Sequence, residues 1–449
     1  MTTPETLHRW DFDHVWHPFT QASEWEAEGA PLIIEAGVGC TLIDVHGNQY
    51  LDGISSLWTN VHGHNHPMIN EALQAQINRI SHSTLLGQAG RPSIELARRL
   101  AVLLEAIEGP GPALARTFFS DSGSTSVEVA LKMAFQYHQQ TGDMKRTRFA
   151  ALTEAYHGDT IGSVSVGGID LFHKIYRPML FDAVRIPAPD RASEPEEQDC
   201  LTTARALFHE HGSEIAALVV EPLVQGAAGM RMHSPEFLRT IIDMARSAGC
   251  LVICDEVAVG FGRTGTMFAM EQVGRRPDII CLAKGITGGY APLAATVVND
   301  VIYDAFRGPY TDFRTLFHGH TYTGNALACA SALASLDVFE SEQTIAGLPP
   351  RIEALSQALA NLPSDHIAEI RQKGMMGAAV LRHNFEPSDR IGHRVAMAAR
   401  NHGVIVRPLG DAIIFMPPLS MSTLEIETLG AAVGRAIVEV LSPSGGESH

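Results

Sequence analysis

Two short apolar runs, each followed closely by a charged residue, constrain the fold of this chain most strongly. Leu251–Cys254 is followed directly by Asp255, and Ile279–Leu282 is followed by Lys284 after one intervening alanine. An unbroken apolar strand is typical of a sheet that is covered on both faces. Because ligands of open α/β sheets bind outside the carboxyl ends of the strands, we expect Asp255 and Lys284 to face one ligand.

The chemistry of these two residues points to pyridoxal 5'-phosphate (PLP). A lysine can form a Schiff base with the aldehyde of PLP, and an aspartate can keep the pyridine nitrogen protonated. Each residue also has a plainer interpretation. A lysine after a strand is commonly a solvated cap, and the pair Asp255–Glu256 could solvate the strand end or bind a metal. These two residues alone therefore do not establish PLP binding, and other motifs of the chain have to support the hypothesis.

A glycine-rich segment, Gly260–Gly265, favours an alternative of another class, a nicotinamide oxidoreductase. Its letters GFGRTG satisfy the dinucleotide-binding pattern G-x-G-x-x-G. That pattern requires the glycines to follow a strand directly and to open a helix. Here Asp255, Glu256 and further residues intervene, so the match is weak. Purified protein that gains no yellow absorbance with PLP would favour this alternative.

Composition and charge exclude several classes of partner. The chain has 449 residues, 45% of them apolar and 18% charged, which is typical of an enzyme with two or three lobes. The formal net charge of −17 argues against nucleic acid and anionic membranes as partners, and against a PLP-binding gene regulator. Six dispersed cysteines without a C-x-x-C pair indicate a reducing compartment, and we expect a cytoplasmic protein.

Phe118–His138 predicts a strand that turns into a helix. Small polar residues begin the helix, and Thr125 and Glu128 stand at capping-box spacing. The free N–H groups of a helix N-terminus suit a phosphate, although a plain N-cap fits equally well. Tyr156, after the next predicted strand, is either a core aromatic or a ring that stacks on a flat ligand.

The remaining pattern predicts an α/β fold. We expect a hairpin over Gly37–Asp52, a surface loop over Pro187–Asp199, a buried strand over Ile215–Val220 and a helix from Ser234 to Gly249. Strands and helices alternate through the middle third, which predicts a mostly parallel sheet with helices on both faces. The tail after about Leu336 is expected to form a separate α+β lobe.

Three histidines, His62, His64 and His66, stand at alternate positions in SSLWTNVHGHNHP. Glycine and asparagine separate them, and no acidic or thiolate residue stands nearby to complete a ligand set. We therefore expect no metal site.

Nine stretches of the chain carry a resemblance to a known family. They are WHPFTQ at 16–21, SSLWTNVHGHNHP at 55–67, FFSDSGSTSVEVALKMA at 118–134, AYHGDTIGSVSVGG at 155–168, EPLVQGAAGM at 221–230, DEVAVGFGRTGTMFAMEQ at 255–272, CLAKGITGGY at 281–290, HGHTYTGNALACA at 318–330 and VRPLGDAIIFMPPL at 406–419. Through them the chain resembles, nearly from end to end, the class III aminotransferases of PLP fold type I.

The resemblance implies an architecture. It comprises a mostly parallel central sheet with helices on both faces, plus a smaller α+β lobe built from the two chain ends. We expect an N-terminal arm and part of the small domain at 1–65, a large PLP-binding domain at 66–335 and a C-terminal small domain at 336–449. The family also implies a homodimer whose active sites lie at the subunit interface.

The resemblance further implies residue roles. Lys284 forms the Schiff base with PLP, Asp255 pairs with the pyridine nitrogen, and Tyr156 packs on the ring and borders the substrate. The other residues implied to bind the cofactor are Gly123 and Ser124 at the phosphate, Glu221, Val257, His320 and Thr321. The others implied to bind substrate are Phe19, Leu57, Trp58, Asp159, Arg263, Gly319 and Arg407. Of these, Gly319, His320 and Thr321 would reach in from the neighbouring subunit, and Arg407 would take the far carboxylate of the acceptor.

Within the class, the stretches look most like the branch that converts 8-amino-7-oxononanoate to 7,8-diaminononanoate in biotin biosynthesis, by a ping-pong reaction. Many members have tyrosine where this chain has Phe19, and a Trp-Trp pair where it has Leu57 and Trp58. The usual amino donor is S-adenosylmethionine, but one branch uses lysine, and the SSLW, HSTLLG and PLGD stretches look more like that branch. Both donors remain open. A broad ω-amino acid:pyruvate aminotransferase is the alternative enzyme.

Overall fold

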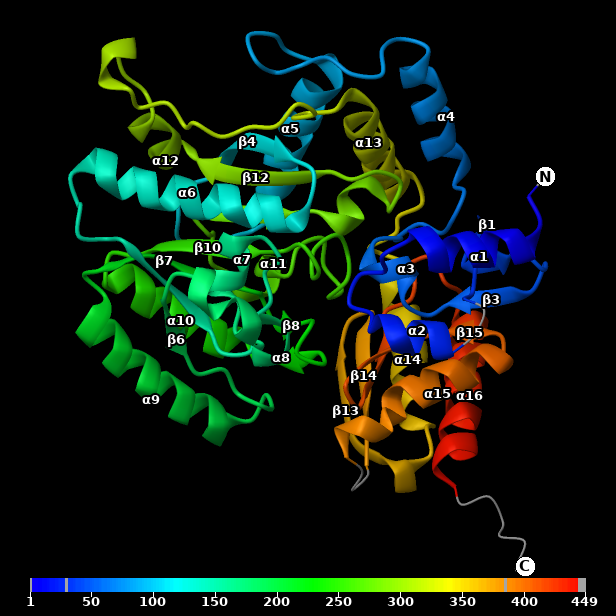
Figure 1. Ribbon diagram of the computed structural model, residues 1–449. Helices are drawn as coiled ribbons and strands as arrows, with labels where there is room; N and C mark the ends of the chain where they lie inside the picture. The colour runs from blue at the N-terminus through cyan, green and yellow to red at the C-terminus, as the bar shows by residue number, and fades with distance from the viewer. Residues whose placement is uncertain (1, 29–30, 383–385, 443–449) are drawn as a thin grey trace, which may run out of the picture.

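The computed structural model describes residues 2–28, 31–382 and 386–442 and consists of two units that lie side by side (Figure 1). The larger unit contains a seven-stranded sheet, and the smaller contains two four-stranded sheets. Within the described ranges every helix is too short or too polar to cross a lipid bilayer.

The seven-stranded sheet is the core of the larger unit. Its strands, in spatial order, are β4 (Leu114–Ser120), β12 (Ala294–Asn299), β11 (Ile279–Leu282), β10 (Leu251–Asp255), β7 (Ile215–Val220), β5 (Arg148–Leu152) and β6 (Ala183–Ile186). β12 runs antiparallel to both of its neighbours, and the five strands from β11 to β6 are parallel. The expected mostly parallel sheet is confirmed.

Both faces of this sheet are buried, which explains the unbroken apolar runs. In β10, Val252 and Cys254 pack into one hydrophobic cluster and Ile253 into another on the opposite face. The face of Ile253 is covered by α6 (Gly123–Thr141), with α7 (Ile161–Val166) and α12 (Asp300–Ala305) alongside. The other face carries α5 (Arg91–Leu104), α10 (Pro235–Ser247), α13 (Ala326–Ser341) and, beside α10 and against β6, α9 (Glu194–His211).

The smaller unit combines the two ends of the chain. One sheet has the order β13 (Ile367–Lys373), β14 (Met376–Leu381), β17 (Ala412–Phe415) and β16 (Arg407–Leu409). The second has the order β1 (Ile34–Val38), β2 (Thr41–Asp44), β3 (Gln49–Asp52) and β15 (Val404–Ile405). Since β15 pairs with β3, N-terminal and C-terminal segments share one sheet. Its helices are α14 (Leu348–Ala360), α15 (Ile391–Asn401) and α16 (Thr423–Leu441).

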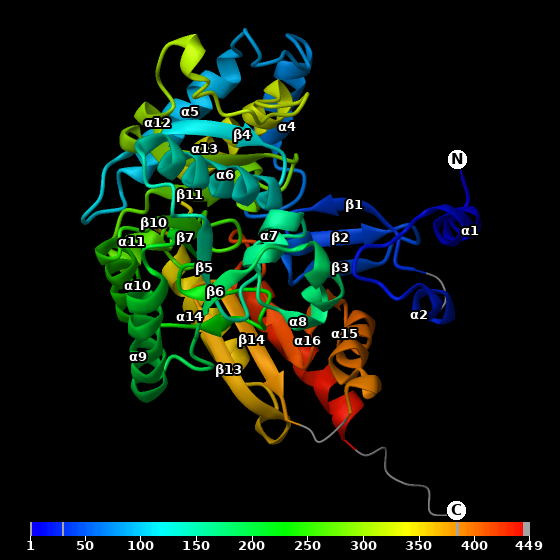
Figure 2. The same cartoon turned by 60° about the vertical axis from the view of Figure 1, so that its left-hand side comes forward.

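The first two helices, α1 (Pro4–His14) and α2 (Ala22–Ala27), project away from the body of the molecule (Figure 2). Neither helix has a buried residue, and Trp16 between them is 93% exposed. The chain then enters the large unit through α3 (Ser55–Trp58) and α4 (Pro67–Ile77).

The structure confirms several sequence expectations. β2 and β3 form the hairpin expected within Gly37–Asp52. The buried strand over Ile215–Val220 is β7, and the helix expected to end at Gly249 is α10. The boundary expected between residues 335 and 336 falls inside α13, so the chain does not change direction there.

Two local expectations were wrong. The capping box of α6 joins Ser122 and Thr125, not Thr125 and Glu128, because the helix begins one turn earlier. The Glu128 carboxylate instead accepts a hydrogen bond of 2.6 Å from the Gly162 N–H at the start of α7. The loop expected over Pro187–Asp199 gives way to α9 at Glu194, where a proline in the first turn and acidic residues near the positive helix end favour a start.

Candidate active site

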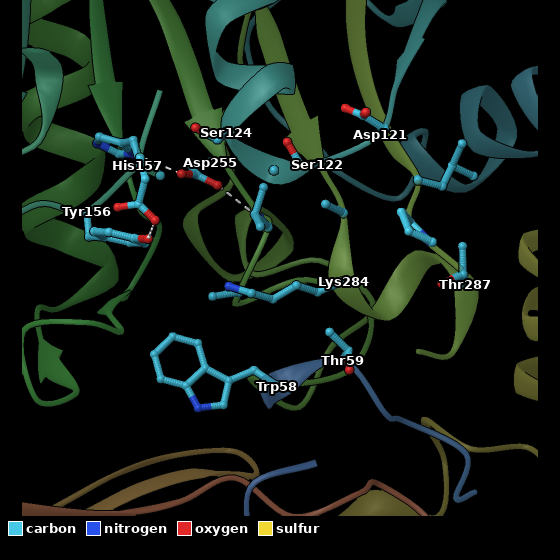
Figure 3. A pocket seen from close by; sticks show the side chains of 18 of the residues that line it. Trp58, Thr59, Asp121, Ser122, Ser124, Tyr156, His157, Asp255, Lys284 and Thr287 are labelled. Atoms are coloured by element: carbon cyan, nitrogen blue, oxygen red, sulfur yellow. Dashed lines mark hydrogen bonds and ion pairs between the residues drawn. The ribbon is translucent and has the colours of Figure 1, made fainter. Parts of the chain in front are cut away.

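A cavity of about 710 Å³ opens at the carboxyl ends of β10 and β11. Asp255, Lys284, Tyr156, Ser124 and Trp58 all line it, as Figure 3 shows. Because β10 and β11 are neighbouring parallel strands, the residues that follow them meet at one edge of the sheet. The expectation that Asp255 and Lys284 face one site therefore agrees with the geometry.

The carboxylate of Asp255 is buried and held from two sides. Its Oδ1 accepts a hydrogen bond of 3.0 Å from the Val257 N–H, and its Oδ2 lies 2.8 Å from Nδ1 of His157. His157 is 3% exposed, and its Nε2 has no partner among the residues that the structure describes. The acceptor role of the carboxylate requires Nδ1 to carry the proton, so His157 fixes the orientation of Asp255.

His157 is not among the site residues expected from the sequence. The histidine directly follows Tyr156 in the AYHGDT stretch, which was the only available signal. Its bond to Asp255 spans 98 positions of the chain, and a local pattern does not reveal such a contact.

Lys284 follows β11 in a left-handed backbone conformation, with φ of 49°. Its Nζ lies 4.9 Å from the ring centroid of Trp58. Figure 3 shows the two side chains next to one another. Burial lowers the pKa of Lys284 below its ordinary value, and the negative charges of Asp255 and Glu221 oppose this shift. A lysine with a lowered pKa has a larger neutral fraction, which is the form that attacks a carbonyl carbon or accepts a proton.

Trp58 lies at the end of a strained turn. Ser55, Ser56 and Trp58 all have positive φ values, of 53°, 62° and 67°. The carboxylate of Asp52 stabilises this turn by accepting hydrogen bonds of 2.9 Å and 2.7 Å from the Ser56 N–H. Strain of this kind persists where the surroundings fix it, and it places the Trp58 ring against the cavity. The neighbouring Leu57 points outward and is exposed.

Tyr156 and Glu221 form one wall of the cavity. The Tyr156 hydroxyl donates to Oδ2 of Asp159 at 2.7 Å, and burial raises the pKa of Tyr156. The buried Glu221 accepts hydrogen bonds of 3.1 Å from the N–H groups of Tyr156 and Gly226. Burial raises the pKa of Glu221 to about 7.

The N-terminus of α6 meets the cavity with Gly123 and Ser124. The Ser124 hydroxyl lies 2.9 Å from the Thr160 hydroxyl and also accepts from the Thr160 N–H at 2.9 Å. Gly158 has φ of 112°, and a Cβ there would lie 2.4 Å from Ser124 Oγ. A side chain at 158 would therefore displace Ser124, the second residue of the helix.

These residues fit PLP. An amine with a lowered pKa, a buried carboxylate held by a histidine and the positive end of a helix line one cavity. Val257, beside Gly123, completes the floor. The three histidines of the 62–66 segment are engaged separately, with Ser335, Asp52 and Glu342.

Two arginines expected at the substrate do not line this cavity. Arg263 is 1% exposed, and its guanidinium donates to the carbonyls of Pro417 at 2.6 Å and Asn60 at 2.9 Å. It joins the loop after β10 to both chain ends. Arg407 is half-buried on β16, and its guanidinium has no hydrogen-bond partner among the described residues.

The remaining expected residues lie outside the cavity within this chain. Gly319 and Thr321 are exposed and His320 is half-buried, in the loop before α13. Phe19 is exposed and packs edge-on against Phe172 at 5.4 Å between centroids. Phe172 in turn lies 6.2 Å from the Tyr156 ring, so Phe19 reaches the cavity wall through one intermediate aromatic residue.

The dinucleotide interpretation of Gly260–Gly265 is wrong. The segment forms turns after β10 and does not open a helix; the next helix, α11, begins only at Met270. Gly262 and Gly265 have φ values of 89° and 102°, so these glycines serve the turns.

Comparison with known proteins identifies the family. The family described as "Aminotransferase class-III" matches residues 23–437. The adenosylmethionine-8-amino-7-oxononanoate aminotransferase of Nitratidesulfovibrio vulgaris is 56% identical over 446 residues, covering 96% of this chain and 81% of the relative. The enzyme of the same name from Geobacter sulfurreducens is 47% identical, covering 96% and 97% of the two chains.

Solved structures agree. The adenosylmethionine-8-amino-7-oxononanoate aminotransferase of Methanocaldococcus jannaschii is 39% identical with a TM-score of 0.91, covering 98% of this chain and 100% of the other. A PLP-bound amine transaminase from an uncultivated Pseudomonas species is 34% identical with a TM-score of 0.87, covering 95% and 99%. The expected PLP fold type I is confirmed. The chain belongs to the class III aminotransferases and is a PLP-dependent transaminase.

Proposed function

We propose that this enzyme transfers an amino group to 8-amino-7-oxononanoate and forms 7,8-diaminononanoate, a reaction of biotin biosynthesis. The observation that carries the proposal is that relatives from 56% down to 34% identity, each matched over at least 95% of this chain, bear the name of that activity. The Lys284–Asp255 cavity supplies the chemistry that any such transfer requires.

In this proposal, residues of one cavity hold PLP. Lys284 supplies the amine for the aldehyde, and Asp255, oriented by His157, pairs with the ring nitrogen. The helix end at Gly123 and Ser124 takes the phosphate, while Glu221 and Val257 border the ring. When bound, PLP supplies a ring that withdraws electrons from the carbon bearing the amino group.

The protein's own contribution is the control of protons. Because burial favours the neutral form of Lys284, its Nζ is suited to take a proton from the donor carbon and return one to the acceptor carbon. Asp255, fixed by two hydrogen bonds, holds a proton on the ring nitrogen. Tyr156 and Trp58 enclose the reacting groups and limit the access of water.

Substrate recognition is proposed to come from residues of the cavity lining together with residues beyond it. Arg407, whose guanidinium has no partner within the described part of the chain, grips the far carboxylate of the acceptor. Phe19, Leu57, Trp58, Asp159 and Arg263 are proposed to shape the substrate pocket, Arg263 by fixing the chain around it.

The amino donor is proposed to be S-adenosylmethionine or lysine. The name of the relatives supports S-adenosylmethionine. The SSLW, HSTLLG and PLGD stretches support lysine, and Phe19 and Leu57 alter donor recognition, because a phenol hydroxyl and one aromatic face that many members carry are replaced here.

At the level of the whole protein, we propose a cytoplasmic homodimer. Gly319, His320 and Thr321 then complete the site of the neighbouring subunit, which agrees with their absence from the lining of the cavity in their own chain. The proposed division is 1–65, 66–335 and 336–449; the shared sheet of β3 and β15 supports one small domain built from both chain ends, although the boundary at 335 and 336 lies within α13.

The test is steady-state turnover of the PLP-loaded enzyme. We expect 8-amino-7-oxononanoate to exceed pyruvate in kcat/KM by orders of magnitude; the reverse order would instead support a broad ω-transaminase. That alternative rests on an amine transaminase at 34% identity and an (S)-enantioselective ω-transaminase from Thermomicrobium roseum at 32%. Offering S-adenosylmethionine and lysine separately, and recording conversion of the cofactor to its amine form by absorbance, identifies the donor.

A further inference from the structure

A second cavity, of about 460 Å³, lies behind the wall formed by Tyr156. It shares no lining residue with the cavity of Lys284. Its charged and titratable lining consists of three carboxylates, two guanidinium groups and one imidazole, from Glu154, Asp170, Asp182, Arg177, Arg185 and His173. The rings of His173 and Tyr156 are stacked, with 6.3 Å between centroids and 10° between planes, so the two cavities are separated by one pair of rings.

His173 is the first sign that this cavity takes a ligand. The residue is 5% exposed, and neither Nδ1 nor Nε2 has a hydrogen-bond partner among the residues that the structure describes. Burial lowers the pKa of His173, so the ring is neutral near pH 7. A neutral imidazole offers one N–H donor and one acceptor nitrogen, and leaving both unsatisfied in a buried position is costly.

Glu154 is the second sign. It is half-buried, and its carboxylate has no partner within the described residues. Its backbone is in the left-handed region, with φ of 59°, although it is not a glycine. Positions of this kind concentrate at binding sites, where surrounding contacts maintain the strain.

Two guanidinium groups supply the positive charge of the cavity, one held by backbone carbonyls and one exposed at its edge. Arg185 donates to the carbonyls of Val166 and Ser165, both at 2.8 Å. Arg177 at the mouth uses one Nη for Asp170, at 2.7 Å, which leaves its other N–H groups for a ligand. The lining thus presents both a free carboxylate and free N–H donors.

We propose that this second cavity is a binding site for a small zwitterionic amino acid. Its ammonium group pairs with Glu154, and its carboxylate accepts hydrogen bonds from His173 and Arg177. A zwitterion satisfies both kinds of group at once, whereas a simple anion leaves Glu154 unpaired and a simple cation leaves the donors unpaired. Amino-acid binding in this second cavity does not depend on 8-amino-7-oxononanoate being the acceptor substrate.

The test uses the PLP-loaded enzyme after treatment with aminooxyacetate, which captures the cofactor aldehyde as an oxime and so blocks the first cavity. Isothermal titration with L-alanine is expected to show one saturable site per protomer. Acetate and ethylammonium, which carry one half of the ligand each, are expected to bind at least about tenfold more weakly. No saturable heat with L-alanine, or equal binding of acetate, would overturn the proposal.

Variants locate the binding. Glu154→Gln and His173→Phe are each expected to weaken L-alanine binding at least about tenfold, since each removes one charge-assisted hydrogen bond. The phenyl ring preserves the stacking on Tyr156. Glu71→Gln, an exposed carboxylate on α4, is the matched control and should bind as the unchanged protein does. If His173→Phe fails to fold, Glu154→Gln decides alone, and unchanged binding there contradicts the assignment.

Discussion

The hydrogen bonds and burial of individual site residues determine their chemical properties. Asp255 has two hydrogen-bond donors and a buried position, so its carboxylate cannot rotate away from the cavity. Lys284 has the opposite environment, in which burial disfavours its charge. One group is therefore fixed as an acceptor and the other is prepared to lose its proton.

Lys284→Ala is expected to abolish the near-visible absorbance of the Schiff base and to lower kcat by on the order of 10³-fold or more, because no other lysine lines the cavity among the described residues. Absorbance spectra and turnover test this together. Lys145→Ala, at an exposed position, is the control. Retained turnover in Lys284→Ala would refute the assignment.

His157→Ala is expected to lower kcat by roughly tenfold, because Asp255 loses the partner that orients it. The absorbance of the bound cofactor should also change its pH dependence, since the proton on the ring nitrogen is held less firmly. His157→Asn, which keeps a donor near the same position, should restore part of both. A pH profile identical to that of the unchanged enzyme would show that His157 serves the fold alone.

Among the secondary-structure elements, the N-terminus of one helix contributes most to the proposed phosphate site. α6 and α16 both begin with a capping box, Ser122 with Thr125 and Ser422 with Glu425. Only α6 points into the cavity. The same local motif therefore stabilises one helix and, in the other, also presents N–H groups to an anion.

Ser122→Ala and Ser422→Ala are each expected to lower the free energy of unfolding by about 1 kcal/mol, the usual effect of losing an N-cap. Only Ser122→Ala should also weaken PLP binding, because it loosens the helix start at the proposed phosphate site. Urea unfolding and PLP titration of both variants measure this. Equal PLP affinity in the two variants would argue against a phosphate at α6.

The segment after β10 should respond to pH through Glu256. This carboxylate accepts from the N–H groups of Ala269 and Met270 at the start of α11, and burial raises its pKa from 4.5 to about 8. The folded protein thus retains a proton that the unfolded chain releases, so this contribution to stability is full at low pH and is lost as pH rises through about 8. Glu256→Gln should show a smaller loss of unfolding free energy between about pH 6 and about pH 9; an unchanged loss would contradict the shift.

At the scale of the whole molecule, one side chain ties the large unit to both ends of the chain. Arg263 leaves the loop after β10 and donates to carbonyls at Asn60 and Pro417. Burial lowers its pKa to about 9. Two buried carbonyls far apart in sequence thus receive their hydrogen bonds from one guanidinium. The active-site cavity lies near the segments that this guanidinium connects.

Arg263→Leu is expected to lower the free energy of unfolding by roughly 2–4 kcal/mol, because two buried carbonyls lose their donor. Arg275→Leu, which breaks a partly exposed pair with Asp243, should cost less than about 1 kcal/mol. Denaturant unfolding of both variants measures the difference. Equal effects would mean that Arg263 is not a structural tie.

Local pattern allowed much of this protein to be predicted. The apolar runs of β10 and β11 predicted strands covered on both faces, because a strand that is buried on both faces has apolar side chains at every position. The positions of Asp255 and Lys284 followed from the rule for strand ends. Motif resemblance extended this to the family, which comparison confirmed.

Only the tertiary structure decided the contacts between segments that are distant in the sequence. The bond of His157 to Asp255, the carbonyls held by Arg263 and the cavity at His173 each join residues that no periodicity relates. The polarity of the side chains predicts which of them are buried. Which partner each then meets depends on how whole elements pack, and that is fixed only when the chain is folded.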